Sequence, residues 1–203
     1  MEHKKTDRRV RKTKRQLRDG LARLMEEKSI REIKVKELVE AVDINRSTFY
    51  LHYSDIDDMF TRIEEELIGE IRDALSQHPL GPHRQSLAFL CRLFEIMEEN
   101  RAICKALCGP HGDINFVLRL ESMVAEEALQ ALKPFVAQAT EREIDFLYAY
   151  CLNGCVGLVK LWLLYDGQET PAEMADIVVR MVSNTLREYY ERRELLQETG
   201  GIS

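Results

Sequence analysis

The sequence predicts an all-α protein of about nine helices, with a small N-terminal helix-turn-helix domain and a larger helical body. Apolar residues recur at intervals of three and four along most of the 203-residue chain. No segment shows the strict alternation that marks a half-buried strand. Proline and glycine stand at the expected helix ends, and basic residues gather near the N-terminus.

The first helix is expected to begin at Asp7, as its N-cap, and to end near Lys28. Its apolar positions recur at helical spacing: Leu17, Leu21, Leu24 and Met25. Two short helices follow, at about 35–42 and 46–53, joined by a turn at Asp43. That turn needs a left-handed backbone, which Asp adopts more readily than most residues other than glycine. Phe49 is expected to face inward from the second short helix.

A connecting helix is expected over 54–77, with Ser54 or Asp55 as its N-cap. The segment 78–82 holds two prolines and one glycine and is the clearest break in the chain. We therefore expect a helix-turn-helix domain over 1–53, with its motif at about 33–53, and a regulatory and dimerisation domain over 78–203. Further helices are expected at about 84–99, 101–108, 114–138, 141–166 and 171–193, the last opened by Pro171.

The charge of the chain is unevenly distributed. Residues 1–53 contain 15 Lys and Arg against 9 Asp and Glu, whereas the remainder contains 14 against 26. Such an asymmetry indicates one part that faces nucleic acid and one that is solvated. The acidic body also repels phosphate and so favours approach to DNA by the basic end.

The second short helix, called the reading helix below, has the side-chain chemistry of a recognition helix that enters the major groove of DNA. Arg46 can donate two hydrogen bonds to guanine, and Thr48 or Tyr50 can bind phosphate or touch a thymine methyl group. Leu51 is also expected to lie outward or at an edge. Each side chain alone is equally typical of a solvated surface, and only the combination favours DNA. The expected DNA contacts are Arg8, Arg9, Lys12, Lys34, Lys36, Arg46, Ser47, Thr48, Tyr50, His52 and Tyr53.

The segment Ser47–Tyr53, preceded by Lys-Glu-Leu-Val-Glu-Ala at 36–41 and followed by an acidic helix start, resembles the TetR family of bacterial transcriptional regulators. The resemblance is specific over 7–70 and weaker over Asn153–Leu158 and the two long terminal helices. It implies a three-helix DNA-binding domain on each subunit of a homodimer, and a palindromic double-stranded DNA operator. It also implies release from DNA when a small molecule fills a cavity in the helical body.

Two features depart from the family pattern. Similar members often carry Lys directly after the aromatic residue that ends the reading helix, and again two residues later. This chain has Ser54 and Ile56 at those positions, followed by two aspartates. Lys34 replaces the Thr or Ser that commonly opens the second helix. We therefore expect phosphate contacts to come from Lys34, Lys36 and the first helix.

Dimerisation is expected through the last two helices. The segment 171–193 has an apolar seam of coiled-coil spacing, and 141–166 is apolar nearly all round. Ordinary packing within one chain is the alternative, but the family favours a four-helix bundle of two copies. The expected interface residues are Gly154, Gly157, Leu158, Ile177, Val178, Met181 and Thr185.

The five cysteines suggest a second kind of sensor. Cys104 and Cys108 lie one helical turn apart, as do Cys151 and Cys155, and such pairs can bind zinc or be oxidised. Cysteine is more often a small buried apolar residue, so we expect no metal and no cofactor. Core packing is likewise the alternative for an apolar ligand pocket lined by Phe94, Met97, Phe116, Tyr148 and Trp162.

The predicted function is that of a homodimeric transcriptional repressor released from its operator by an unknown small molecule. The alternatives are a regulator that depends on a partner protein or on no effector, and a thiol or zinc sensor on the same fold. No phosphate-binding loop or catalytic motif is present, so an enzyme is not expected. Without a signal sequence or a membrane-spanning segment, the expected location is the cytoplasm.

Overall fold

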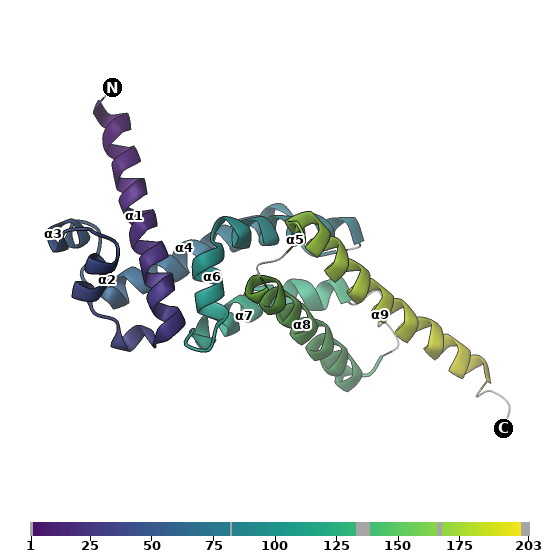
Figure 1. Ribbon diagram of the computed structural model, residues 1–203. Coiled ribbons are helices and arrows are strands. Elements are labelled where there is room, and N and C mark those ends of the chain that lie inside the picture. The colour runs from purple at the N-terminus through teal and green to yellow at the C-terminus, as the bar shows by residue number, and fades with distance from the viewer. Residues whose placement is uncertain (1, 82, 133–138, 166–167, 200–203) are drawn as a thin grey trace. The chain divides into compact units, whose positions relative to one another are not determined.

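The structure is a computed structural model that describes residues 2–81, 83–132, 139–165 and 168–199, without the side chains of 2–8, 83–85 and 189–199. These ranges form no strand and confirm the all-α class (Figure 1). The helices within them are α1 (Glu2–Glu27), a 3-10 helix (Ile30–Glu32), α2 (Val35–Ala41), α3 (Arg46–Tyr50), α4 (Ile56–Gln77), α5 (His83–Glu99), α6 (Arg101–Cys108), α7 (Ile114–Leu132), α8 (Glu141–Leu164) and α9 (Pro171–Thr199).

The chain divides into two compact units. Unit 1 comprises Met1–Glu70 and Glu99–Leu118, and unit 2 comprises Ile71–Glu98 and Arg119–Ser203. The boundaries therefore fall within α4 and α7. The predicted functional division, at residues 53 and 78, follows a different criterion and stays a prediction.

Helix α1 is the centre of unit 1. It packs against α2 and α6, and α2 packs against α3 (Figure 1). Fully buried side chains from each of these helices and from α4 form the core of this unit: Leu17, Leu21, Met25, Leu38, Phe49, Met59, Ile63, Leu67, Ile103 and Leu107. Their recurrence at helical spacing is the reason that the sequence predicted these elements.

A glycine allows α1 and α2 to approach closely. A Cβ atom at Gly20 would lie 2.2 Å from Cγ1 of Val42 and 3.1 Å from Cδ1 of Leu38. No side chain fits at position 20 unless Val42 moves, so the spacing of the two helices depends on this residue.

The turn between α2 and α3 has the predicted conformation. Asp43 adopts φ 53°, in the left-handed region, and the next amide, of Ile44, donates to the carbonyl oxygen of Val39 at 2.9 Å. The left-handed residue reverses the chain within a few residues, as a helix-turn-helix requires.

Helix α4 begins with a network of capping hydrogen bonds. Oδ1 of Asp55 accepts from the amide of Asp58 at 2.7 Å, and Oδ2 of Asp58 accepts from the amide of Ser54 at 2.9 Å. Oδ1 of Asp58 also accepts from Nε of Arg62 at 2.8 Å. Asp55, one of the two predicted caps, therefore holds the first turn of the helix.

Unit 2 has an aromatic pair in its interior. Phe94 on α5 and Trp162 on α8 are buried with their rings edge to face, 5.2 Å between centroids. The indole Nε1 of Trp162 donates to the carbonyl oxygen of Glu169 at 3.0 Å and so ties α8 to the segment before α9. Capping boxes open both helices, Thr140 with Glu143 and Thr170 with Glu173.

Some predicted helix ends are wrong. Helix α1 begins at Glu2 instead of after Asp7, because the preceding residues include good helix formers and no breaker. Helix α3 ends at Tyr50 instead of 53, and α9 extends to Thr199 instead of about 193. Helix α7 ends at Leu132 within the described part, and the remainder of the predicted 114–138 helix lies outside it, as does Gly167.

Candidate nucleic-acid interface

The orientation of α3 is set by two buried aromatic residues. Phe49 is fully buried, and Tyr53 is 5% exposed with its ring centroid 5.7 Å from that of Phe49. The amides of Leu51 and Tyr53 donate to the carbonyl oxygens of Ser47 and Phe49, so the helical turn continues past the end of α3. Phe49 and Tyr53 therefore define the inward side of the whole segment.

The prediction that Tyr53 lies at the surface as a DNA contact was wrong in its placement, because the side chain is buried. It is four residues from Phe49 and therefore on the same helical face, a signal that the sequence already contained. Burial raises the pKa of its phenol, and the guanidinium of Arg62 lies 5.9 Å from its ring centroid. Tyr53 therefore packs beneath the reading helix with Phe49 and stabilises the orientation of that helix.

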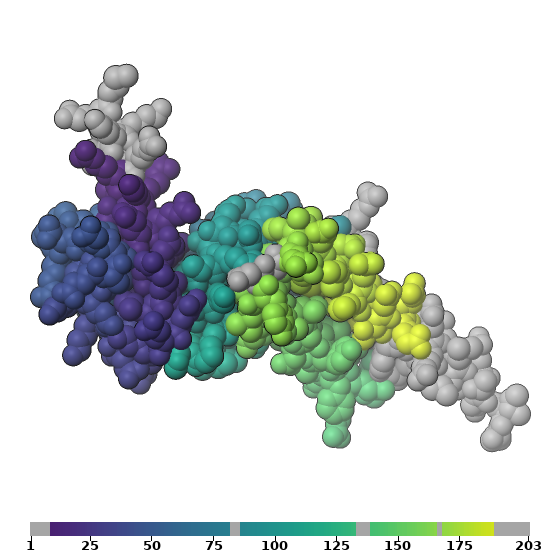
Figure 2. Space-filling view, in the orientation of Figure 1, coloured from purple at the N-terminus to yellow at the C-terminus, as the bar shows by residue number. Residues whose placement is uncertain are grey.

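The other predicted residues of this segment lie at the surface. Arg46, Ser47 and Tyr50 are exposed, and Thr48 and His52 are half-buried. Leu51 is also exposed, and its amide donates to the carbonyl oxygen of Ser47 at 3.2 Å. In the space-filling view the blue segment that contains α3 is open to solvent (Figure 2).

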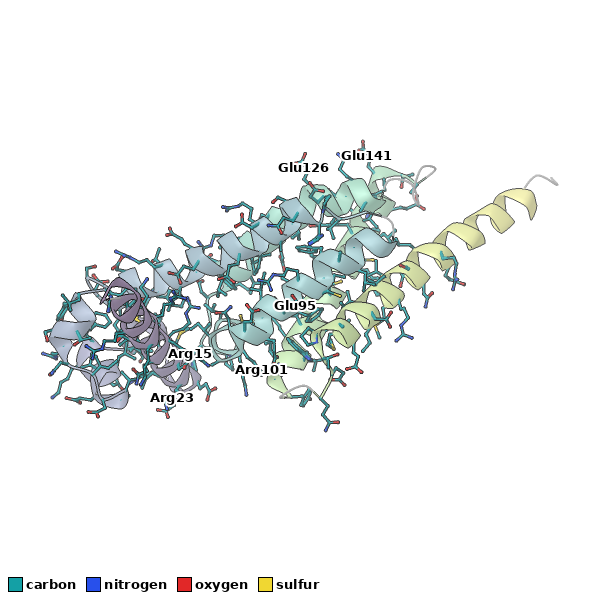
Figure 3. All side chains as sticks on the ribbon, turned by 90° about the horizontal axis from the view of Figure 1, so that it is seen from above. Arg15, Arg23, Glu95, Arg101, Glu126 and Glu141 are labelled. Atoms are coloured by element: carbon teal, nitrogen blue, oxygen red, sulfur yellow. The ribbon has the colours of Figure 1, made fainter. Side chains whose placement is uncertain are left out.

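Basic side chains on the neighbouring helices of unit 1 are also exposed. Arg9 and Lys12 on α1, Lys34 at the N-cap of α2 and Lys36 within α2 are exposed, whereas the side chain of Arg8 lies outside the described residues. Lys36 approaches Glu40 at 3.9 Å, but both side chains are largely exposed, so this pair leaves the lysine accessible. The labels in Figure 3 mark two further exposed arginines of α1, at positions 15 and 23.

A polar contact that the sequence did not indicate ties α1 to other parts of unit 1. Nη1 of Arg18 donates to Oδ1 of Asn100 at 2.6 Å, and its Nη2 donates to Oε2 of Glu66 at 2.5 Å. Arg18 thus connects α1 with α4 and with the residue that precedes α6. The sequence placed it among the basic residues of α1, and only tertiary contacts distinguish it from them.

The predicted pocket residues are not all brought together. Phe94 and Trp162 form the buried pair, and Met97 on α5 is buried too. Tyr148 packs against a separate cluster of Leu132, Leu147 and Leu186. Phe116 belongs to the other unit. As one pocket lining, this set remains a prediction.

The predicted dimer residues differ in their exposure. Gly154 and Met181 are exposed, and Gly157, Leu158, Ile177 and Thr185 are half-buried. Val178 is 1% exposed, so it contributes to the core of its own chain, and its contact with a second copy stays a prediction. On α9, Val178 is therefore on the buried face of the helix, whereas Met181 is on the exposed face.

Cys91, Cys104, Cys151 and Cys155 have raised pKa values. Burial raises the pKa of Cys104 to about 12 and that of Cys155 to about 11. Burial also raises the pKa of Cys151. A protonated thiol is a poor nucleophile and a poor metal ligand, and this weighs against the thiol or zinc sensor. Among the described residues no three His, Cys, Asp or Glu side chains form a metal-binding group.

Comparison with known proteins agrees with this arrangement. A family model described as bacterial regulatory proteins, tetR family, matches residues 17–63, and one described as transcriptional regulator C-terminal region matches 85–184. No curated protein matches the chain in sequence.

Solved structures share the fold. A TetR-family transcriptional regulator from Streptomyces coelicolor is 18% identical with a TM-score of 0.60, over 92% of this chain and 86% of that one. A TetR transcriptional regulator from Streptococcus agalactiae 2603V is 23% identical with a TM-score of 0.53, over 87% and 97%. The dihydroxyacetone kinase operon activator DhaS is 14% identical with a TM-score of 0.56, over 86% and 96%.

The all-helical fold, the exposed reading helix and the two family matches define the class of protein, a helix-turn-helix DNA-binding transcriptional regulator. Together the two family models cover residues 17–63 and 85–184. The chain belongs to the TetR family of bacterial regulatory proteins.

Proposed function

We propose that the chain is a homodimeric repressor that binds a palindromic operator through α3 of each copy. A small molecule that binds in unit 2 releases it from DNA. The observation that carries the proposal is an apolar surface on α8 that is exposed to solvent in the described part of the chain. A second copy of the chain is the partner that this surface fits.

The surface is a stripe along α8. The exposed side chains of Phe146, Tyr150, Leu161 and Leu164 fall at helical spacing, with Gly154 and Gly157 between them. At 100° per residue, all six positions lie within about 80° of the helix circumference. A Cβ atom at either glycine would meet nothing within 4 Å, so a second helix can cross closely at the middle of the stripe.

Helix α9 adds an apolar edge of the same kind. Met181 is 54% exposed, and Ile177, one turn earlier, is half-buried. Oγ1 of Thr185 donates to the carbonyl oxygen of Met181 at 3.0 Å, which satisfies the hydroxyl within the helix. Three of the predicted interface residues therefore suit an apolar contact between two copies.

Helix α8 is also the one helix of the described chain that is long and apolar enough to cross a membrane. Its most apolar stretch of 18 residues has a mean hydropathy of 1.5, and only 17% of that stretch is buried. The proposed dimer accounts for this low burial, because an interface helix is exposed in a single chain. The cytoplasm is the compartment where such a dimer meets DNA.

A dimer also meets the geometry of DNA. Two reading helices that enter successive major grooves must lie about one helical turn, roughly 34–36 Å, apart, and their two-fold symmetry requires a palindrome. For the effector, the support is the buried aromatic pair Phe94 and Trp162, which offers an apolar surrounding in unit 2. Repression and release follow the usual behaviour of the family.

The test combines mass, DNA binding and transcription. Light scattering should give twice the chain mass of 23.6 kDa. A gel shift with the intergenic DNA beside the gene should give a complex whose affinity falls steeply with salt, because phosphate contacts release counterions. A reporter driven by that DNA should fall in the presence of the protein. A monomer, the absence of a salt-sensitive complex or a rise of the reporter would contradict the respective part of the proposal.

A further inference from the structure

An apolar side chain lies at the outermost point of the reading helix. Leu51 is 79% exposed, more than any other large apolar side chain of the described chain. Its φ of −70° and ψ of −19° are helical, and its amide donates to the carbonyl oxygen of Ser47. The expected contact list from the sequence did not include it.

The direction of Leu51 follows from the buried residues. Phe49 and Tyr53 face inward, and successive helical residues are rotated by about 100°. Ser47 and Leu51 are then each about 160° from Phe49, on opposite sides of the outward direction. The middle of the surface that faces a major groove is therefore formed by these two side chains.

The remaining exposed or half-buried residues lie further from the outward direction: Tyr50 and Thr48 are about 100° from Phe49, and Arg46 and His52 about 60°. Arg46 and Tyr50 lie on one side of Ser47 and Leu51, and the ring of Tyr50 meets the buried Phe49 edge to face at 5.5 Å between centroids. The half-buried Thr48 and His52 lie on the other side. Residues at the flanks of a reading helix are nearest to the phosphate backbones, whereas those in the middle are nearest to the base edges.

The chemistry of the base edges identifies what Leu51 can contact. Thymine is the base that presents an apolar group in the major groove, its C5-methyl. Over the edge of any other base a leucine would cover a hydrogen-bond donor or acceptor without replacing it, which is unfavourable. We infer that Leu51 selects thymine in each operator half-site by packing against its C5-methyl group.

This inference rests on the proposed function, since it requires α3 to enter the major groove. It changes the roles that we expected from the sequence. Arg46, at a flank, reads an outer base pair or a phosphate, and Leu51 reads a base at the centre of the half-site. Ser47 beside it hydrogen-bonds to any base and adds little discrimination.

The experiment replaces thymine by deoxyuridine. Binding sites are first selected from a random duplex pool with the full-length protein, and each thymine of the selected site is then replaced in turn. Deoxyuridine keeps every hydrogen-bonding group and removes only the methyl. At about 0.8 kcal/mol for one buried methyl-sized group, the loss is about fourfold per half-site and about fifteenfold for both.

The variant Leu51→Ala makes the test specific. It should bind the thymine site several-fold more weakly than the wild type and should no longer distinguish thymine from deoxyuridine. Leu118→Ala, which truncates a 49% exposed leucine on α7, is the matched control and should retain the discrimination. Both positions are exposed, so neither change threatens the fold.

The outcomes are distinguishable. A selected site whose affinity does not respond to deoxyuridine at any position, or a Leu51→Ala variant that still responds as the wild type does, overturns the inference and leaves the proposed function intact. Failure to select any site or to form a salt-sensitive complex overturns both. A response that is lost in Leu51→Ala and kept in Leu118→Ala supports the inference.

Discussion

Single residues decide how closely the helices of unit 1 approach. Asp43 makes the sharp turn of the helix-turn-helix, and its left-handed backbone was readable from the sequence. Gly20 was not readable in the same way. A glycine inside a helix has several possible reasons, and this one follows from the position of Val42 over it, 2.2 Å from where a Cβ would stand.

Gly20→Ala should therefore destabilise the protein although alanine is the better helix former. Overpacking of this kind costs about 1–3 kcal/mol. Gly69→Ala is the matched control, because a Cβ there meets nothing within 4 Å. It should instead stabilise by about 0.5–1 kcal/mol. Urea unfolding of both variants measures the difference.

A second substitution checks the cause. In the Gly20→Ala background, Val42→Ala removes the atom that the new Cβ would meet, so the loss should be smaller than the sum of the two single effects. Additive effects would show that the contact with Val42 is not the reason for the glycine.

At the scale of elements, helix ends carry much of the local specificity. Compared with the family pattern, Ser54 and the two aspartates after Ile56 indicated weaker contacts with DNA phosphate at this point of the chain. In the structure the carboxylate of Asp58 accepts hydrogen bonds from the amide of Ser54 and from the guanidinium of Arg62. These hydrogen bonds hold the pKa of its carboxyl below the ordinary value of 3.8.

The sign of the resulting pH dependence is fixed. A carboxylate with a lowered folded-state pKa contributes stability above its unfolded pKa and loses this contribution as the pH falls through the folded-state value. Asp58→Asn should therefore destabilise the protein near neutral pH, and its difference from the wild type should vanish as the pH falls below 3.8.

Unfolding free energies of both proteins between about pH 3 and pH 7 test this. Asp57→Asn, in the same helical turn, controls for the change in net charge, because Asp57 is exposed. A difference between Asp58→Asn and the wild type that stays constant over the whole range would exclude the carboxylate as its source.

For the whole molecule, two surfaces are exposed among the described residues and carry the proposed function: the reading helix and the apolar stripe of α8. Phe146 and Tyr150 are 63% and 67% exposed, values that a soluble single chain does not favour for large aromatic residues. The proposed dimer buries the second surface and duplicates the first.

Leu161→Glu should consequently shift the protein from dimer to monomer, because a carboxylate cannot be buried in an apolar interface without a partner. Leu161 is 47% exposed, and Leu118 on α7, 49% exposed, is the matched control. Light scattering measures the mass of each variant, and a gel shift measures binding to the palindrome. Equal masses for Leu161→Glu and Leu118→Glu would show that the dimer contact does not lie on this stripe of α8.

The sequence by itself determined the helical class, the turn at Asp43, most helix limits and the basic character of residues 1–53. These are set by local spacing, backbone preference and charge, which neighbouring residues already contain. The tertiary structure decided the rest. It placed Val178 inward, joined Arg18 to Asn100 and Glu66, and brought Val42 against Gly20. These relations arise between segments distant in sequence, and packing selects them because each helix has several faces that are apolar enough to be buried.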